Sequence, residues 1–169
     1  MKKKVLVAIS GGVDSAVTME LLKKQGYETI GITMIADSDL PAKEAAALSK
    51  EMGWEHHVID VRAAFQQYVK DHFLIEYQQG HTPNPCIMCN KYIKFGVLFD
   101  YMKEVGAEYF STGHYAKVDF SSDWQRYVLK KAAYLPKDQS YVLFGLSQNV
   151  LSRLLLPLGD YKKEEIRKI

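Results

Sequence analysis

The stretch Lys4-Val5-Leu6-Val7-Ala8-Ile9-Ser10-Gly11-Gly12-Val13-Asp14-Ser15 decides the fold class of this chain. Its first half is a continuous apolar run, which is typical of a strand covered on both faces of a parallel sheet. The two glycines that follow permit a tight turn and leave backbone N–H groups accessible. Residues 16–25 then carry apolar side chains at helical spacing, and Gly26 ends the run. The order of strand, glycine turn and helix predicts an anion site, because unpaired N–H groups and the helix dipole meet there.

The glycine turn is not a Walker A loop, because the chain lacks the Gly-Lys-Ser/Thr ending of that motif. Its order, Ser-Gly-Gly-Val-Asp-Ser, resembles the PP-loop of N-type ATP pyrophosphatases. Enzymes of that class split ATP into AMP and pyrophosphate and adenylate their substrate. The alternative is a glycine turn that only joins a strand to a helix. The flanking elements and the residue order favour the phosphate site.

Composition indicates an ordinary globular chain. The 169 residues suffice for one α/β domain, and we take residues 1–169 as one nucleotide-binding domain. Hydrophobic residues make up 47% and charged residues 25%, and the net charge of +2 gives no case for nucleic-acid binding by itself. No segment is apolar for long enough to cross a membrane or to serve as a signal peptide, so we expect a cytoplasmic location.

Strand and helix signals alternate along the chain. They predict strands at residues 29–34, 56–61 and 109–112, helices at 41–52, 63–79 and 98–105, and a hairpin of 115–119 with 126–130. This alternation predicts an α/β fold with a parallel twisted sheet and helices on both faces. Ligands bind such sheets at the carboxyl ends of the strands, where the glycine turn, Met34 and Gly113 fall. A helix begins at residue 162 without a closing signal, so we expect a domain truncated at its C-terminal end.

The second informative stretch is His81-Thr82-Pro83-Asn84-Pro85-Cys86-Ile87-Met88-Cys89-Asn90-Lys91. Asn84 is a good N-cap and Pro85 a good first helical residue. Both cysteines then lie in the first turns of a helix, where the dipole stabilises a thiolate, and we expect an accessible and acidic Cys89.

Three other interpretations of the cysteine pair stay open. A zinc site would need two more ligands, for which His81 or His114 could serve. A thioredoxin-like dithiol has the same spacing but lacks its usual aromatic neighbour. Two inert buried thiols are the third, because free cysteine is often a core residue. These residues alone do not define a metal site.

Four stretches together carry a family resemblance: residues 10–15, 82–90, 111–115 and 137–141. In order and spacing the chain resembles the tRNA-specific 2-thiouridylase (MnmA) family, which thiolates the wobble uridine of certain tRNAs. The resemblance implies a PP-loop fold and an ATP-dependent tRNA-uridine sulfurtransferase. Its implied chemistry is adenylation of the uridine C2 oxygen, followed by sulfur transfer from a cysteine persulfide, giving 2-thiouridine, AMP and pyrophosphate. The implied ligands and partners are ATP, Mg²⁺, tRNA and a persulfide sulfur-donor protein.

The resemblance also implies residue roles. The ATP phosphates would be held by Ala8, Ile9, Ser10, Gly11, Gly12, Val13, Asp14 and Ser15. The adenosine would meet the backbone of Met34 and Gly113. The target base would lie beside Asn84, Pro85 and Cys86, and the tRNA would contact Lys137, Asp138 and Gln139. Cys89 matches the nucleophilic cysteine of the family.

Two departures from the family pattern matter. Many members carry Asp where Cys86 stands, which puts a catalytic role of Cys86 in doubt. The family also uses a second, later cysteine as persulfide carrier, and later tRNA-binding and β-barrel domains, so we expect this chain alone to be incomplete. An iron–sulfur cluster would be conceivable only in a full-length parent, because two thiolates are too few. The rival functions are another PP-loop sulfurtransferase or ligase, and a non-catalytic nucleotide- or RNA-binding short form.

Overall fold

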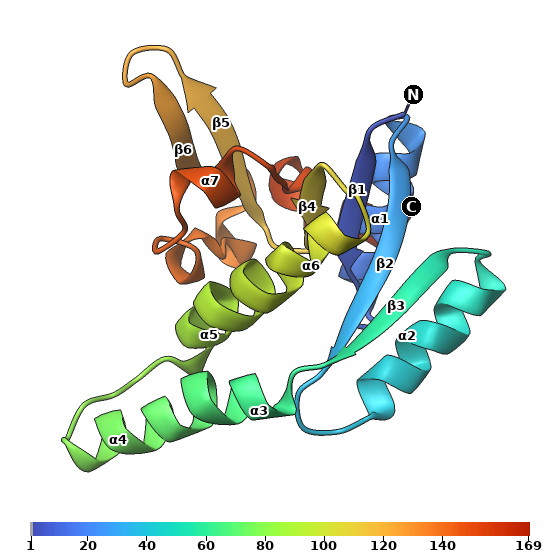
Figure 1. Cartoon of the computed structure of the whole chain (residues 1–169). Helices are drawn as coiled ribbons and strands as arrows, with labels where there is room; N and C mark the ends of the chain where they lie inside the picture. Colours follow the sequence, from blue (N-terminus) through green and yellow to red (C-terminus); the bar gives the residue numbers. More distant parts are fainter. Residues whose placement is uncertain (1) are drawn as a thin grey trace.

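The computed structural model describes residues 2–169 and is built on one five-stranded sheet (Figure 1). All neighbouring strands are parallel, in the order β3-β2-β1-β4-β7. The strands are β1 (Lys4–Ala8), β2 (Glu28–Ile35), β3 (Glu55–Asp60), β4 (Tyr109–Ser111) and β7 (Leu154–Leu155). The predicted α/β class and parallel sheet are confirmed.

Helices cover both faces of this sheet, as the alternation along β1 dictates. Leu6 points into a core formed with helical side chains of residues 93–102, whereas Val5 and Val7 point into a second core. The second core contains side chains from α1 (Val13–Lys24) and α2 (Leu40–Glu51). Because successive side chains of a strand point to opposite faces, one apolar run supplies both cores. The prediction of helices on both faces is therefore confirmed.

Two long helical stretches fill the chain between β3 and β4. The first is an arm that extends away from the sheet, made of α3 (Arg62–Phe65), the π-helix η1 (Gln66–Asp71) and α4 (His72–Gln78) (Figure 1). The second runs without a break through α5 (Pro85–Met88), the π-helix η2 (Cys89–Leu98) and α6 (Phe99–Glu104). The sequence predicted the start of this second stretch, at Asn84 and Pro85, and its end, from residue 98, but not the residues between, which lack simple 3.6-residue periodicity.

The C-terminal third forms a hairpin and short turns of helix. The hairpin pairs β5 (Ala116–Ser121) with β6 (Arg126–Lys131) in antiparallel register, close to the predicted bounds. The later elements are the 3₁₀ turns η3 (Leu135–Lys137), η4 (Ser140–Val142) and η5 (Pro157–Asp160), with α7 (Gln148–Leu151) and α8 (Lys163–Ile166). Among the described residues, no helix is long and apolar enough to cross a membrane.

Two sequence predictions are corrected here. The first helix begins at Val13 rather than at residue 16, so the last residues of the Ser-Gly-Gly-Val-Asp-Ser motif already belong to its first turn. The fifth strand, β7, was not predicted, because two residues are too short a run to give a periodic signal. Its pairing with β4 arises from tertiary contact, which a local pattern does not record.

Candidate nucleotide site

The glycine turn is shaped by one residue in a left-handed backbone conformation and by the start of α1. Gly11 has φ +79°, a left-handed conformation that glycine adopts without steric cost. Gly12 is the N-cap residue, and its carbonyl accepts the first helical hydrogen bond, from the Ala16 amide at 3.2 Å. The amides at positions 13–15 precede that bond and have no partner within the helix. The turn therefore presents donors where an anion would bind.

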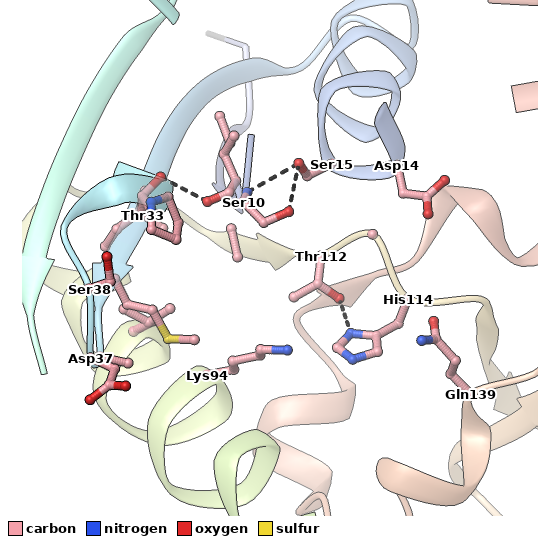
Figure 2. Close-up of a pocket in the computed structure, with 18 residues that line it drawn as sticks. Ser10, Asp14, Ser15, Thr33, Asp37, Ser38, Lys94, Thr112, His114 and Gln139 are labelled. Carbon is pink, nitrogen blue, oxygen red and sulfur yellow. Dashed lines mark hydrogen bonds between the residues drawn. The ribbon is translucent and has the colours of Figure 1, made fainter. Parts of the chain in front are cut away.

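The hydroxyl groups of the motif brace the same turn. Ser15 Oγ donates to the Gly12 carbonyl at 2.8 Å and accepts from the Ser10 amide at 3.2 Å. The Ser10 and Ser15 hydroxyls lie 3.4 Å apart (Figure 2). These bonds hold the turn in one geometry before any ligand arrives. The entropic cost of ordering the turn on ligand binding is therefore smaller.

The segment after β4 packs directly on the glycine turn. A Cβ atom added at Gly113 would lie 3.2 Å from the Ser15 amide nitrogen and from the Asp14 carbonyl carbon. Because both are backbone atoms, a side chain at this position would displace the turn. Gly113 is thus required for close approach, with no unusual φ angle involved.

A cavity of about 470 Å³ opens beside this turn, at the carboxyl ends of β1, β2 and β4 (Figure 2). The predicted ATP residues that line it are Ala8, Ile9, Ser10, Asp14, Ser15, Met34 and Gly113. Gln139, predicted to contact tRNA, lines it as well. Gly11, Gly12, Val13, Asn84, Pro85, Cys86, Cys89, Lys137 and Asp138 do not. The topology thus gathers residues that lie more than one hundred positions apart in the sequence.

Three charged side chains line the cavity. Asp14 accepts hydrogen bonds from the Tyr115 hydroxyl at 2.9 Å and from the Lys163 ammonium of α8. Asp37 pairs with Lys70 of the arm at 2.6 Å. Lys94, from the π-helix η2, is the third, and the sequence pattern gave no reason to expect it in the site.

His114 contributes a neutral ring to the cavity wall. It is buried, and its Nδ1 lies 2.7 Å from the Thr112 hydroxyl. Burial, with the nearby Lys94 charge as a smaller cause, lowers the pKa of His114 to about 3. The ring therefore stays uncharged at neutral pH and offers a hydrogen-bonding nitrogen without a positive charge. The zinc interpretation gains no support, because no group of three potential metal ligands occurs within residues 2–169.

The cysteine helix begins as predicted. Asn84 caps it, accepting a hydrogen bond from the Cys86 amide at 3.0 Å, and Pro85 is the first helical residue. Cys86 is exposed, while Cys89 is partly buried. Burial raises the pKa of the Cys89 thiol, and the opposing Lys94 charge is a smaller influence. The prediction of an acidic Cys89 is therefore wrong for this state of the protein, because desolvation outweighs the helix start.

The predicted tRNA segment at residues 137–139 divides into an exposed and an internal part. Lys137 is exposed. Asp138 accepts hydrogen bonds from the Ala132 amide and the Ser140 hydroxyl, at 2.8 and 2.7 Å. Gln139 Oε1 accepts from the Tyr115 amide at 3.0 Å. Asp138 and Gln139 thus hold the base of the hairpin in place, and only Lys137 projects a free head group to solvent.

Comparisons with known proteins identify the family of the chain. The family model described as "tRNA methyl transferase HUP domain" matches residues 3–169. A tRNA-specific 2-thiouridylase MnmA from Syntrophomonas wolfei is 48% identical over 166 residues, which cover 98% of this chain and 49% of that protein. One from Desulforudis audaxviator is 51% identical over 164 residues, covering 97% and 48%. The chain thus spans about half the length of the curated relatives it matches.

A solved structure supports the fold alone. The predicted subunit of tRNA methyltransferase from Methanocaldococcus jannaschii superposes with a TM-score of 0.64 at 20% identity, covering 98% of this chain and 73% of that one. The sequence match, in contrast, covers nearly every residue and both diagnostic loops. The chain belongs to the tRNA methyl transferase HUP domain family, whose curated relatives here are named tRNA-specific 2-thiouridylases.

Proposed function

We propose that this chain is the nucleotide-binding and adenylating part of a tRNA 2-thiouridylase. The observation that carries the proposal is the cavity at the strand ends, which places the Ser10–Ser15 turn opposite Met34, Lys94 and His114. Unpaired amides at a helix start favour phosphate, and the apolar wall near Met34 suits an adenine ring. The family relationship supplies the reaction class.

The chain's own residues would bind and orient ATP. The amides of the glycine turn and the Ser10 hydroxyl would hold phosphate oxygens, while backbone groups at Met34 and Gly113 would meet the adenosine. Asp14 is the carboxylate at the turn, and Mg²⁺ commonly binds through one or two carboxylates together with substrate phosphates. Asp14 would thus hold the ion, which neutralises phosphate charge when bound.

The reaction would proceed in three balanced steps. The uridine C2 oxygen attacks the α-phosphorus of ATP, and pyrophosphate leaves. The terminal sulfur of a persulfide then attacks C2, the C2–O bond breaks, and AMP leaves. The remaining sulfur–sulfur bond is cleaved by the Cys89 thiolate, which forms a disulfide with the carrier and leaves 2-thiouridine. Cys89 must lose its proton for this last step, and burial opposes that loss in the free protein because it raises the pKa of the thiol.

The RNA would approach over the start of the cysteine helix. Asn84, Pro85 and Cys86 are exposed there, and Lys137 is exposed beside the hairpin base. A lysine that contacts phosphate contributes salt-dependent affinity. We propose that the persulfide comes from a donor protein and a carrier cysteine other than Cys86. Cys86 is exposed, and its position beside the target uridine would suit contact with RNA.

Pyrophosphate release tests the proposal. The chain is mixed with ATP, Mg²⁺ and a tRNA transcript, without a sulfur donor, and pyrophosphate is measured over time. We expect a burst close to one equivalent per protein with a wobble uridine, and none when that uridine is replaced by cytidine. Uridine-independent release would contradict the proposal.

One observation favours a second candidate, a module that binds nucleotide without chemistry. The raised pKa of Cys89 describes a thiol that is protonated at neutral pH in the free protein. The same assay separates the two functions. ATP binding by calorimetry without any pyrophosphate burst would favour the binding module, whereas the burst excludes it.

A further inference from the structure

Lys94 is a cation without a partner in the nucleotide cavity. It is the only lysine or arginine that lines the cavity among residues 2–169. The two carboxylates of the cavity wall have other partners, Asp14 with Lys163 and Asp37 with Lys70. No carboxylate of the described chain lies within 4.0 Å of the Lys94 ammonium, since it occurs in none of the ion pairs. A partly buried ammonium without a counterion is poised for an anionic ligand.

The π-helix explains why Lys94 reaches this position. In an α-helix, residues five apart point about 140° away from each other. A π-helix bonds each residue to the one five positions along, which brings residues five apart onto one face. The π-helix η2 begins at Cys89, so Lys94 lies one such turn along from it. The Lys94 charge accordingly reaches both the Cys89 thiol and the His114 ring.

Figure 2 shows the result of this placement. The Lys94 side chain extends from its helix toward His114, across the cavity from Ser10 and Ser15. The glycine turn and Lys94 thus face the cavity from opposite sides. A nucleotide held between them has phosphate oxygens available to both.

We propose that Lys94 binds the α-phosphate of the nucleotide and couples it electrostatically to Cys89. The inference rests on the proposed function and names the residue that recognises the reacting phosphate. The adenylated oxygen joins the α-phosphorus to the uridine C2, the atom that receives sulfur. The phosphate nearest Cys89 is therefore the α-phosphate, and the cation on the Cys89 face of η2 meets it. The glycine turn is left for the outer phosphates, which leave as pyrophosphate.

This arrangement makes the thiol sensitive to the nucleotide. Lys94 and Cys86 are the two titratable groups whose charges reach Cys89, the first favouring and the second opposing its thiolate. A phosphate bound to Lys94 offsets the lysine charge, so the pKa of Cys89 rises while the nucleotide is bound. When AMP leaves, the charge is restored and the thiolate is favoured again. Lys94 would thereby time the last step of the reaction.

Binding of AMP and adenosine to matched variants tests the contact. Lys94→Met keeps the length and the apolar stem but removes the charge, and Lys94→Arg keeps the charge. Lys91→Met is the control, because Lys91 is exposed on the same helix and lies over the Tyr92 ring, 4.9 Å from its centroid. We expect Lys94→Met to weaken AMP binding about 10- to 100-fold, as for loss of a charge-assisted hydrogen bond. The affinity of Lys94→Met for adenosine should be the same as that of the parent protein. Lys94→Arg and Lys91→Met should bind AMP as tightly as the parent protein does.

Alkylation of Cys89 against pH supplies the second readout, in a Cys86→Ser background. AMP should raise the pKa of Cys89 in the parent protein, adenosine should not, and neither should act in Lys94→Met. Equal AMP affinity in folded Lys94→Met and parent protein overturns the inference alone. Absence of any AMP or ATP binding to the parent overturns the proposed function as well. If Lys94→Met does not fold, Lys94→Gln takes its place with the same criteria.

Discussion

Substitution of Gly11 by alanine tests whether the glycine turn is the phosphate site. The left-handed φ of +79° at Gly11 costs an L-residue about 1–2 kcal/mol. The added Cβ would also lie 3.3 Å from Glu44 Cβ and 3.5 Å from the Ala45 amide, which leaves little room for relaxation. Relief of this strain by rotation of φ would turn the amides of the loop away from the cavity. We therefore expect both lower stability and lower ATP affinity.

The matched control is Gly53→Ala. Gly53 has φ +65°, and nothing lies within 4 Å of an added Cβ. Alanine at position 53 would have a similar conformational cost, but this position lies just after the end of α2 and does not line the cavity. In a domain of this size, 1–2 kcal/mol corresponds to a melting temperature about 2–8 °C lower. Both variants should show this shift, while only Gly11→Ala should lose ATP affinity, by about tenfold or more.

Calorimetric titration with ATP and Mg²⁺, together with thermal unfolding, measures the two effects. Wild-type ATP affinity in folded Gly11→Ala would refute the reasoning. A valine substitution at Gly12 would test the turn in a different way. Gly12 has an ordinary φ of −86°, and an added Cβ would meet only Ser10 Oγ, at 3.6 Å. Strain is thus specific to Gly11, and Gly12 matters only for approach of the phosphate.

Three further predictions concern the cysteine helix and the cavity wall. Asn84→Ala removes the helix cap and should lower the free energy of unfolding by about 1 kcal/mol in urea, while Asn84→Asp should retain most of it. Cys86 should be alkylated faster than Cys89 at pH 8, because Cys86 is exposed and burial raises the pKa of Cys89; mass spectrometry of the labelled peptides decides the order. Burial lowers the pKa of His114 to about 3. Between pH 6.5 and pH 3 this histidine is protonated in the unfolded chain but not in the folded one. The free energy of unfolding should therefore fall as the pH drops through this range. At pH 5 this share is about 2 kcal/mol, and a His114→Gln variant whose stability shows the same pH dependence as the parent would exclude it.

Local patterns were sufficient to predict the glycine turn and the start of the cysteine helix. In both, a few adjacent residues fix the backbone: Gly11 at its positive φ, and Asn84 with Pro85 at the helix start. The residues between Cys89 and Leu98 escaped prediction because a π-helix does not repeat every 3.6 residues. The same deviation hid Lys94, whose position in the cavity depends on that helix type.

Long-range contacts account for the rest of what the sequence could not show. Asp14 of the phosphate turn is held by Tyr115 and by Lys163, which lie 101 and 149 positions away in the chain. Gln139 lines the cavity because its side chain accepts a bond from the Tyr115 amide. None of these partners follows from the motif itself. Residue roles carried over from a family resemblance therefore need the tertiary structure, which assigns Asp138 to an internal support rather than to a free contact.

The position of Asp14 connects the wall of the cavity to the last helix of the described chain. Its carboxylate lines the cavity, yet in the free protein it is bound by a hydroxyl and an ammonium from the C-terminal third. An Mg²⁺ ion arriving with ATP would compete with the Lys163 ammonium for the same oxygen, since both are cations. Lys163 would then be free to turn toward a phosphate, because its charge no longer has a counterion. Through this exchange, a bound nucleotide would change how α8 is tied to the glycine turn.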